Sequence, residues 1–365
     1  MSSIEVRVPL PLPRKGRGSS SQMVHRFAGD ARGAFDDGWG TLEDDLSQRA
    51  AAPATQVTAE VPRSAITRNQ SPDIHFDYGL NPYRGCEHGC IYCYARPTHS
   101  YLNLSPGLDF ETRLIAKPGL PAVLAAELQA PAYVPQQIVI GSATDAYQPI
   151  ERTWRITRGV LEVLQACHHP LAIVTKGSGI ERDLDILAPM ARQQLAAVYV
   201  TITTLDPQLA RILEPRAAAP HRRLRTIRAL AEAGVPVGVS VAPQIPFITD
   251  DMEQVLQAAA DCGARCAFYT VMRLPWELNA LFQEWLAQHY PQRAERVMAR
   301  IREMRGGKDY DADFSTRMKG SGVWAELIAQ RFHKTCARLG LNRERVGLDV
   351  GQFRPALLSR QQPLF

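Results

Sequence analysis

Three closely spaced cysteines constrain this chain more than any other feature of its sequence. Cys86, Cys90 and Cys93 stand in the order CxxxCxxC, and an aromatic residue, Tyr92, precedes the last of them. This spacing lets three thiolates reach one metal centre from a single loop, and thiolates favour iron–sulfur clusters, zinc or copper(I). The next cysteine is Cys167. A 4Fe–4S cluster held by three cysteines keeps one iron open to a reactant, whereas a structural metal site is closed.

A structural zinc site is the alternative for the same loop. Zinc in such sites takes four ligands, commonly from two CxxC or CxxH pairs. His88 and His99 lie close enough in the sequence to complete such a set. The spacing alone therefore leaves both metals open.

The loop resembles the cluster loop of the radical S-adenosylmethionine enzymes. Asn-Pro-Tyr-Arg-Gly-Cys at 81–86 and Tyr-Ala-Arg-Pro-Thr-His at 94–99 are similar to the branch related to spore photoproduct lyase. The resemblance implies that S-adenosylmethionine binds the open iron of a 4Fe–4S cluster through its amino and carboxylate groups. One electron from the reduced cluster then yields a 5'-deoxyadenosyl radical. A low-potential electron donor of the flavodoxin or ferredoxin type is implied as a partner.

Length, charge and cysteine usage set the outer bounds. The 365 residues suffice for one large α/β domain with appendages, without disulfide support. Seven cysteines and no evident secretory leader predict a reducing, cytoplasmic setting. No apolar run reaches ~18 residues, so we expect no membrane span. A formal charge of +5 permits a polyanionic partner without requiring one.

The chain divides into three parts by pattern. Residues 1–60 carry Pro, Gly, Ser and acidic runs with little apolar periodicity, which predicts a largely disordered arm. Residues 61–275 alternate apolar runs with helical patterns, as βα units do. Residues 276–365 predict a helical extension that covers the open side of the domain.

The alternating region predicts six βα units. Six units are too few for an eight-stranded barrel, and the resemblance implies the partial (β/α)6 barrel of radical S-adenosylmethionine enzymes. Right-handed crossovers would bring the C-terminal ends of all strands to one face. The predicted strands are a short segment before Cys86 and the runs 138–142, 171–176, 197–203, 235–242 and 266–272, and the predicted helices are 121–128, 155–167, 183–193, 222–233 and 250–262.

Polar residues at these strand ends are the candidate binding residues. By the resemblance, Thr144 and Asp145 contact the amino group and ribose of S-adenosylmethionine, and Lys176 pairs with its carboxylate. Charge-assisted hydrogen bonds of this kind are the strong ones. Thr201 stands where relatives carry a cofactor-binding serine, and Tyr92 belongs to the same cradle.

The segment around Glu214 resembles the Glu-Pro loop of the same branch. Glu214 or Arg216 is a candidate contact to ribose or substrate, or else braces the loop against Arg222 and Arg223. Farther along, an aspartate at 250 or 251 is expected to cap a helix.

One departure from the resemblance concerns the substrate. Spore photoproduct lyase has a hydrogen-donating cysteine just before the positions of Thr144 and Asp145, and this chain has Ala143 there. Strict spore photoproduct lyase activity is therefore not expected. Tyr147 is the candidate hydrogen relay in its place, with Tyr94 and Tyr269 as alternatives.

The C-terminal part offers weaker signals. The loops 305–311 and 317–322 are basic enough to meet a phosphate backbone, or are simply solvated. Cys262, Cys266 and Cys336 are expected to be core thiols. The last residues, Gln-Gln-Pro-Leu-Phe, resemble the peptide by which bacterial replication and repair proteins bind the sliding clamp, with Gln361, Leu364 and Phe365 in the matching places.

Three hypotheses follow. The first is a radical S-adenosylmethionine enzyme that acts on nucleic acid in a repair-like or modification-like reaction, with a base reached outside the stack. The second keeps the chemistry but acts on a peptide, RNA or a small metabolite. The third is a non-catalytic DNA- or clamp-associated module whose metal is structural.

Overall fold

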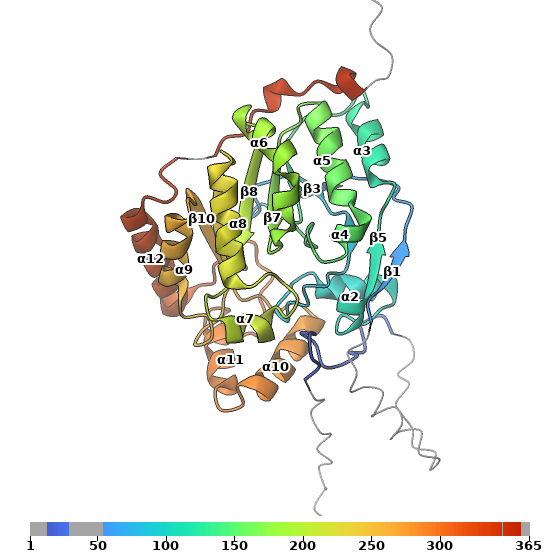
Figure 1. Ribbon diagram of the computed structural model, residues 1–365. Coiled ribbons are helices and arrows are strands. Elements are labelled where there is room, and N and C mark those ends of the chain that lie inside the picture. The colour runs from blue at the N-terminus through green and yellow to red at the C-terminus, as the bar shows by residue number, and fades with distance from the viewer. Residues whose placement is uncertain (1–12, 29–53, 345, 359–365) are drawn as a thin grey trace, which may run out of the picture.

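The computed structural model describes residues 13–28, 54–344 and 346–358. A twisted sheet lies behind a row of helices, as Figure 1 shows for β7 and β8 behind α5, α6 and α8. The sheet order is β10-β9-β8-β7-β6-β3-β2. All neighbours from β3 to β10 pair in parallel, and β2 pairs with β3 in antiparallel orientation. The strands are β2 (Thr67–Arg68), β3 (Tyr78–Leu80), β6 (Ile138–Ile140), β7 (Leu171–Thr175), β8 (Ala196–Thr201), β9 (Val237–Gln244) and β10 (Cys266–Val271).

The prediction of six parallel strands is confirmed within the described residues, and the order of the strands follows the chain. Each central strand is a nearly continuous apolar run buried on both faces, which is typical of parallel sheets covered by helices. The covering helices are α3 (Leu120–Leu128), α5 (Ile156–Ala166), α6 (Leu184–Arg192), α8 (Pro220–Glu232), α9 (Met252–Asp261) and α12 (Gly322–Leu339). Their apolar faces and the sheet form the main core.

A second core lies at the C-terminal ends of the strands. Cys90, Ile91 and Tyr92 pack there against apolar residues of α7 (Pro207–Leu213), α10 (Glu277–His289) and α11 (Ala294–Glu303). Trp285 of α10 is almost fully buried and donates its indole N–H to the carbonyl of Ile212. The helices predicted after residue 276 therefore separate: α10 and α11 pack under the cysteine loop, whereas α12 packs on α9 and β10.

Short elements complete the described chain. A small sheet of order β1-β5-β4 flanks the cysteine loop, with β1 (Gln56–Ala59), β4 (Tyr83–Arg84) and β5 (Arg113–Ala116). The remaining helices are η1 (Arg96–Leu102), α2 (Asp109–Thr112), α4 (Glu151–Trp154), η2 (Ser178–Asp183), η3 (Val350–Gln352) and η4 (Pro355–Leu358). In the part of the chain that the structure covers, no helix is both long and apolar enough to cross a membrane.

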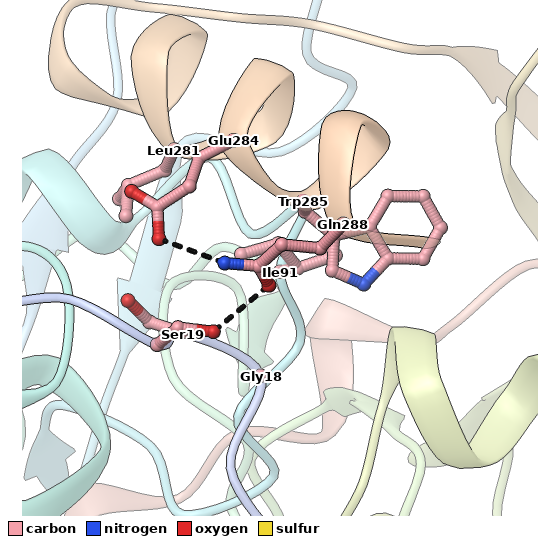
Figure 2. Close-up of a pocket in the computed structure, with 8 residues that line it drawn as sticks. Gly18, Ser19, Ile91, Leu281, Glu284, Trp285 and Gln288 are labelled. Atoms are coloured by element: carbon pink, nitrogen blue, oxygen red, sulfur yellow. Dashed lines mark hydrogen bonds between the residues drawn. The ribbon is translucent and has the colours of Figure 1, made fainter. Parts of the chain in front are cut away.

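Residues 13–28 differ from the disordered arm expected over 1–60. This segment, which we call the strap, lies between α2 and α10 (Figure 1) and buries the side chains of Arg17, Ser19 and Ser20. Figure 2 shows it facing Ile91 and the α10 residues Glu284 and Gln288 across a small pocket. Residues 54–60 also depart from the expectation, because they supply β1. The rest of the expected arm, 1–12 and 29–53, lies outside the described residues, as does the terminal peptide 361–365.

Candidate active site

The cysteine loop follows β3 at the C-terminal edge of the sheet and is built from three consecutive turns. The carbonyls of Cys86, Cys90 and Cys93 accept hydrogen bonds from the N–H groups of residues 89, 93 and 96, at 3.3, 3.2 and 3.1 Å. Each cysteine thus begins a turn. Gly89 has φ +66, and a Cβ there would stand 2.7 Å from a carboxylate oxygen of Glu111. The loop requires glycine at that position for both conformation and space.

The three thiols are free and influence one another. Cys86 and Cys90 are buried and Cys93 is half-buried. Burial raises the pKa of Cys86 well above its usual range, and the neighbouring Asp145, Cys90 and Cys93 raise it further. Burial also raises the pKa of Cys90 to about 12, although the positive charge of Lys176 acts in the opposite direction. These electrostatic effects show that the three thiols are near neighbours within the loop.

The described residues fit an iron–sulfur cluster better than a zinc ion. No group of three His, Cys, Asp or Glu side chains among them is arranged to hold a single metal ion. His99 bonds through Nε2 to the carbonyl of Arg113 at 3.0 Å, and Nδ1 of His88 lies 3.3 Å from Asp145. Neither histidine completes a tetrahedral set with the thiols. A cluster that presents separate iron corners suits three cysteines in successive turns.

A buried ion pair supports the loop from behind. The guanidinium of Arg96 donates to the carbonyls of Gly89 and Cys90 at 3.0 and 2.8 Å, and pairs with Glu111 at 2.5 Å. Both side chains of the pair are fully inaccessible to solvent. The other carboxylate contacts of Glu111 come from the strap, because the N–H groups of Gly18 and Ser19 donate to it at 2.9 Å. One carboxylate thus ties the strap to the backbone of the cysteine loop.

Asp145 lies under the loop with its carboxylate occupied by the protein. It accepts hydrogen bonds from Thr175 Oγ1 at 2.7 Å and from the N–H of Lys176 at 2.6 Å, besides its contact with His88. Burial alone would raise the pKa of Asp145, but the effect of His88 and these hydrogen bonds holds it far below its usual range. The carboxylate therefore joins the cysteine loop to the end of β7.

Lys176 and Tyr92 form the opposite wall. The ammonium of Lys176 lies 5.6 Å from the centre of the Tyr92 ring. Burial lowers the pKa of Lys176, but the net shift is upward because Cys90 and Glu214 stabilise the charged form. Within the described residues Lys176 has no ion-pair partner, so its charge is available to a ligand.

Behind this wall is a second buried ion pair. Glu214 accepts the Tyr92 hydroxyl at 2.8 Å and pairs with Arg223. Burial raises the pKa of Glu214, but Arg223 and Lys176 lower it overall. Arg223 also donates to the carbonyl of Thr201 at 2.9 Å. Glu214 thus braces the loop, through Arg223 and not through Arg222, which pairs with Glu181.

Comparison with known proteins agrees with this geometry. The Radical SAM superfamily model matches residues 80–259, which include the cysteine loop and strands β4 to β9. An uncharacterised protein of Mycobacterium tuberculosis is 37% identical over 234 residues, 63% of this chain and 68% of its own. The chain that carries Cys86, Cys90 and Cys93 therefore belongs to the radical SAM superfamily. A second uncharacterised protein, from Methanocaldococcus jannaschii, is 26% identical over 220 residues, 60% of this chain and 79% of its own.

Solved structures show the same fold. Spore photoproduct lyase complexed with dinucleoside spore photoproduct has a TM-score of 0.51 and 15% identity, covering 78% of this chain and 80% of the other. A mutant of the same enzyme with bound AdoMet and dinucleoside spore photoproduct has a TM-score of 0.50. At this identity the likeness establishes the radical SAM fold and not the reaction.

The structure brings most of the predicted radical SAM residues to one edge of the sheet. Thr144 donates its hydroxyl to the carbonyl of Tyr83 at 2.9 Å, which fixes the β6 loop against the cysteine loop. Thr201 is buried at the end of β8. Ala143 packs on the small apolar cluster of Cys86, Ala95 and Phe110. No thiol takes the place of Ala143 beside the cysteine loop.

The candidate relay Tyr147 has a structural partner. Its hydroxyl donates to the buried Asp183 at 3.0 Å, within a group of ion pairs that includes Arg182 and Glu151. Tyr269 packs on Phe332 in the main core, with ring centres 4.7 Å apart. Among the three tyrosines considered, Tyr94 alone is exposed beside the cysteine loop.

Several sequence expectations change. Asp251 precedes α9 but makes no side-chain cap, because its carboxylate accepts from Thr204 and from the N–H of Leu205. The two basic loops are solvated only in part, because Lys308 and Lys319 are exposed whereas the arginine that begins each loop is held by the protein. Arg305 is buried and donates to two carbonyls, and Arg317 pairs with Asp73 at 2.5 Å. Neither arginine is free to meet a phosphate backbone.

Sequence reasoning missed Arg96 and Glu111, whereas it named Arg223 as one of two candidate braces for the Glu214 loop. The Tyr-Ala-Arg run after the last cysteine could have indicated Arg96, because a cation so close to a buried loop needs a partner. Nothing local indicates Glu111, whose partners Ser19 and Arg96 both precede it by 15 or more residues in the chain.

Proposed function

We propose that this radical SAM protein cleaves S-adenosylmethionine reductively and directs the resulting radical at a nucleic-acid substrate. The observation that carries the first half is the placement of an unpaired lysine ammonium opposite three free thiols. Cys86, Cys90 and Cys93 would hold a 4Fe–4S cluster with one iron open. When bound, the cluster and S-adenosylmethionine supply a 5'-deoxyadenosyl radical.

The chain's own residues position and enclose the reactants. Lys176 would pair with the carboxylate of S-adenosylmethionine, because its charge has no internal partner. The carboxylates of Asp145 and Glu214 already accept hydrogen bonds from the protein, from the N–H of Lys176 and from Arg223 respectively. In this arrangement they orient the groups around the binding site and do not contact the ligand themselves. The predicted contacts of Thr144, Thr201 and Tyr92 to the cosubstrate remain part of the proposal.

Support for a nucleic-acid substrate comes from two directions. Structures of spore photoproduct lyase that share this fold hold a dinucleoside photoproduct. The net charge of +5 also favours a polyanion over a cationic substrate. Alanine at 143 removes the thiol expected of a strict spore photoproduct lyase, so a different base or a different hydrogen donor is implied.

The partners expected from the sequence belong to the same proposal. A flavodoxin or ferredoxin would supply the electron, because the cluster has to be reduced before it reacts. Sliding-clamp binding through Gln361, Leu364 and Phe365 concerns residues outside the described part of the chain. It is tested by comparing clamp affinity before and after deletion of residues 361–365.

The decisive experiment is anaerobic turnover. Reconstituted protein is reduced with dithionite, and 5'-deoxyadenosine is quantified with ultraviolet-irradiated DNA, undamaged DNA, a peptide library or no addition. We expect formation in every arm and several-fold stimulation by one of the DNA samples. Stimulation by peptides alone would overturn the nucleic-acid half, and no 5'-deoxyadenosine in any arm would overturn the proposal as a whole.

A further inference from the structure

Three exposed aromatic rings from three separate segments meet around one arginine. Phe27 belongs to the strap, Tyr101 to η1 and Trp276 to the turn between β10 and α10, and they are 52%, 66% and 63% exposed. The guanidinium carbon of Arg26 lies 4.6, 5.1 and 4.5 Å from the three ring centres, respectively. We call Phe27, Tyr101 and Trp276 the aromatic platform. Scattered exposed apolar residues need no explanation, but rings gathered from distant segments do.

The platform is held in place by a carboxylate. Both oxygens of Glu277 accept from Arg26, the closer contact being 2.7 Å, and the hydroxyl of Ser100 lies 3.4 Å from the same group. Glu277 therefore fastens the strap and η1 to the start of α10. Its charge compensates that of Arg26, so the guanidinium acts as a flat surface among the rings. A preorganised surface of this kind loses little conformational entropy when it binds a ligand.

Trp276 is held in a strained conformation that its burial does not explain. Its φ of 46 and ψ of −124 lie outside the allowed left-handed region for a bulky residue. Strain of this kind persists only where the surroundings impose it, and it gathers at functional sites. Because the ring is mostly exposed, the core gains little from it. The conformation instead leaves the indole exposed to solvent against the guanidinium of Arg26.

A second pair of ring and guanidinium lies closer to the thiols. Tyr94 directly follows Cys93, is 47% exposed, and donates its hydroxyl to the carbonyl of Ser142. The guanidinium carbon of Arg273 lies 5.2 Å from its ring centre. Arg273 has no ion pair within the described residues, and its buried Nε has no hydrogen-bond partner. A guanidinium without an ion pair of its own therefore lies against Tyr94, at the start of the segment that also carries Tyr101.

We propose that the aromatic platform stacks unpaired bases of a DNA strand, while Arg273 meets a backbone phosphate beside the thiol site. The proposal rests on the proposed function, since it names how that substrate would be held. Every base has an aromatic face, so rings bind single strands with little regard to sequence, and arginine adds cation–π contact. We expect the ligand to be a polyanion because the guanidinium of Arg273, which has no ion pair within the described residues, is positively charged.

The test measures binding of the reconstituted holoenzyme to a fluorescein-labelled oligothymidine and to a duplex of equal length. We expect Trp276→Ala and Tyr101→Ala to weaken oligothymidine binding by about 5- to 100-fold, which is the range for loss of one base-stacking contact. Trp276→Phe keeps a ring and should bind within a few-fold of wild type. Leu357→Ala, which removes an exposed apolar side chain of η4, serves as the matched control.

Salt dependence separates stacking from phosphate contact. Arg273→Ala should lower the slope of log affinity against log salt by about 0.7, the value for one phosphate of a single strand. Trp276→Ala should leave that slope unchanged. Thermal unfolding midpoints and iron content of each variant establish that the fold is intact.

The outcomes distinguish this inference from the proposed function. If DNA stimulates 5'-deoxyadenosine formation but the platform variants bind oligothymidine as wild type does, the platform assignment is overturned and the proposed function stands. If the variants lose oligothymidine binding but no DNA affects 5'-deoxyadenosine formation, the platform stands and the nucleic-acid function is overturned. Wild-type protein that binds no oligothymidine overturns the platform as a DNA site.

Discussion

Lys176 differs from its charged neighbours because its charge is not used by the protein. Arg96, Arg223 and Arg182 each have a carboxylate partner, whereas the described residues give Lys176 none. Cys90 and Glu214 favour the charged form of Lys176, yet neither forms an ion pair with it, so the ammonium keeps its direct contacts for a ligand carboxylate. Lys176 is therefore the cation of this site best suited to select the cosubstrate.

Replacement of this lysine should weaken binding of S-adenosylmethionine. We expect Lys176→Met to raise the dissociation constant by about 10- to 100-fold, the range for loss of a charged hydrogen bond of about 1.5–3 kcal/mol. Equilibrium dialysis with the anaerobic holoenzyme measures it. Lys308→Met removes an exposed lysine of the loop after α11 and is the control. Equal affinity of the two variants would mean that Lys176 has no part in binding.

The ion pair behind the cysteine loop should be costly to break. Glu111→Gln leaves Arg96 buried without an opposite charge, and loss of one partner of such a pair typically costs about 3–5 kcal/mol. Chemical denaturation measures the free energy of unfolding. The exposed pair of Arg300 and Glu303 provides the control, since Glu303→Gln should cost less than about 1 kcal/mol. Similar losses in both variants would show that burial of the pair is unimportant.

The local sequence pattern was sufficient to predict the three cysteines as metal ligands, but it did not predict the residues that hold their loop in place. The three cysteines form a motif because the chemistry requires ligands close together in one loop. Arg96 and Glu111 meet only after the chain has folded, and Glu111 also depends on the strap. Tyr147 was a candidate hydrogen relay in place of a thiol at Ala143, yet its hydroxyl donates to Asp183. Sequence proximity indicates which loop a residue joins, not which way its side chain points.

At the scale of elements, the strap is the main addition to the expected fold. Its sequence is polar and glycine-rich, so it gives no periodic signal. It is nevertheless held by backbone donors to a buried carboxylate and by Ser21 to Glu284 at 2.9 Å. The helices and strands of the barrel were predictable because their apolar residues recur at regular intervals along the face that is buried. The strap is held through its backbone N–H groups, so its side chains need not follow such a repeat.

A methyl group at Gly18 should displace the strap. A Cβ there would lie 1.8 Å from the carbonyl oxygen of Gly89, which is backbone and cannot move aside easily. We expect Gly18→Ala to lower the free energy of unfolding by about 1–3 kcal/mol and to speed proteolysis of residues 13–28. Gly347→Ala meets no atom within 4 Å and should do neither. If residues 13–28 of the Gly18→Ala variant resisted proteolysis as well as those of wild type, the close approach of Gly18 to Gly89 would be contradicted.

A buried histidine connects the C-terminal segment to the barrel. His169 bonds to the Tyr133 hydroxyl at 2.7 Å and to the carbonyl of Pro170 at 3.0 Å, and its ring packs against Phe353. Burial lowers the pKa of His169 to about 4. The folded protein therefore keeps this ring neutral under mildly acidic conditions in which the unfolded chain binds a proton.

This difference predicts how stability depends on pH. Because the folded pKa lies below the ordinary value of about 6.5, the contribution of His169 is complete above pH 6.5 and declines as the pH falls toward 4. The loss should approach about 3 kcal/mol. Denaturation at a series of pH values should show a shallower decline for His169→Gln than for wild type, whereas exposed His75→Gln should follow wild type. If the free energy of unfolding of wild type and of His169→Gln declined in parallel with falling pH, the decline could not be attributed to His169.

For the whole molecule, one sheet edge collects the chemistry. The six parallel strands follow one another in order, so the loop that leaves the C-terminal end of each strand lies at the same edge, and the sequence pattern predicted this arrangement. The pattern did not predict that α10 and α11 would pack beneath the cysteine loop while α12 covers β10. Helical period shows that a face is buried, but it does not indicate which surface covers it.

The most direct test of the account is the iron content of single cysteine variants, together with 5'-deoxyadenosine formation. After anaerobic reconstitution we expect about four irons per wild-type chain and reductive cleavage of S-adenosylmethionine. Cys93→Ser should lose both, whereas Cys336→Ser, which alters a core thiol on α12, should keep both. Full iron content and 5'-deoxyadenosine formation in the Cys93 variant would contradict the claim that Cys86, Cys90 and Cys93 hold the reactive cluster.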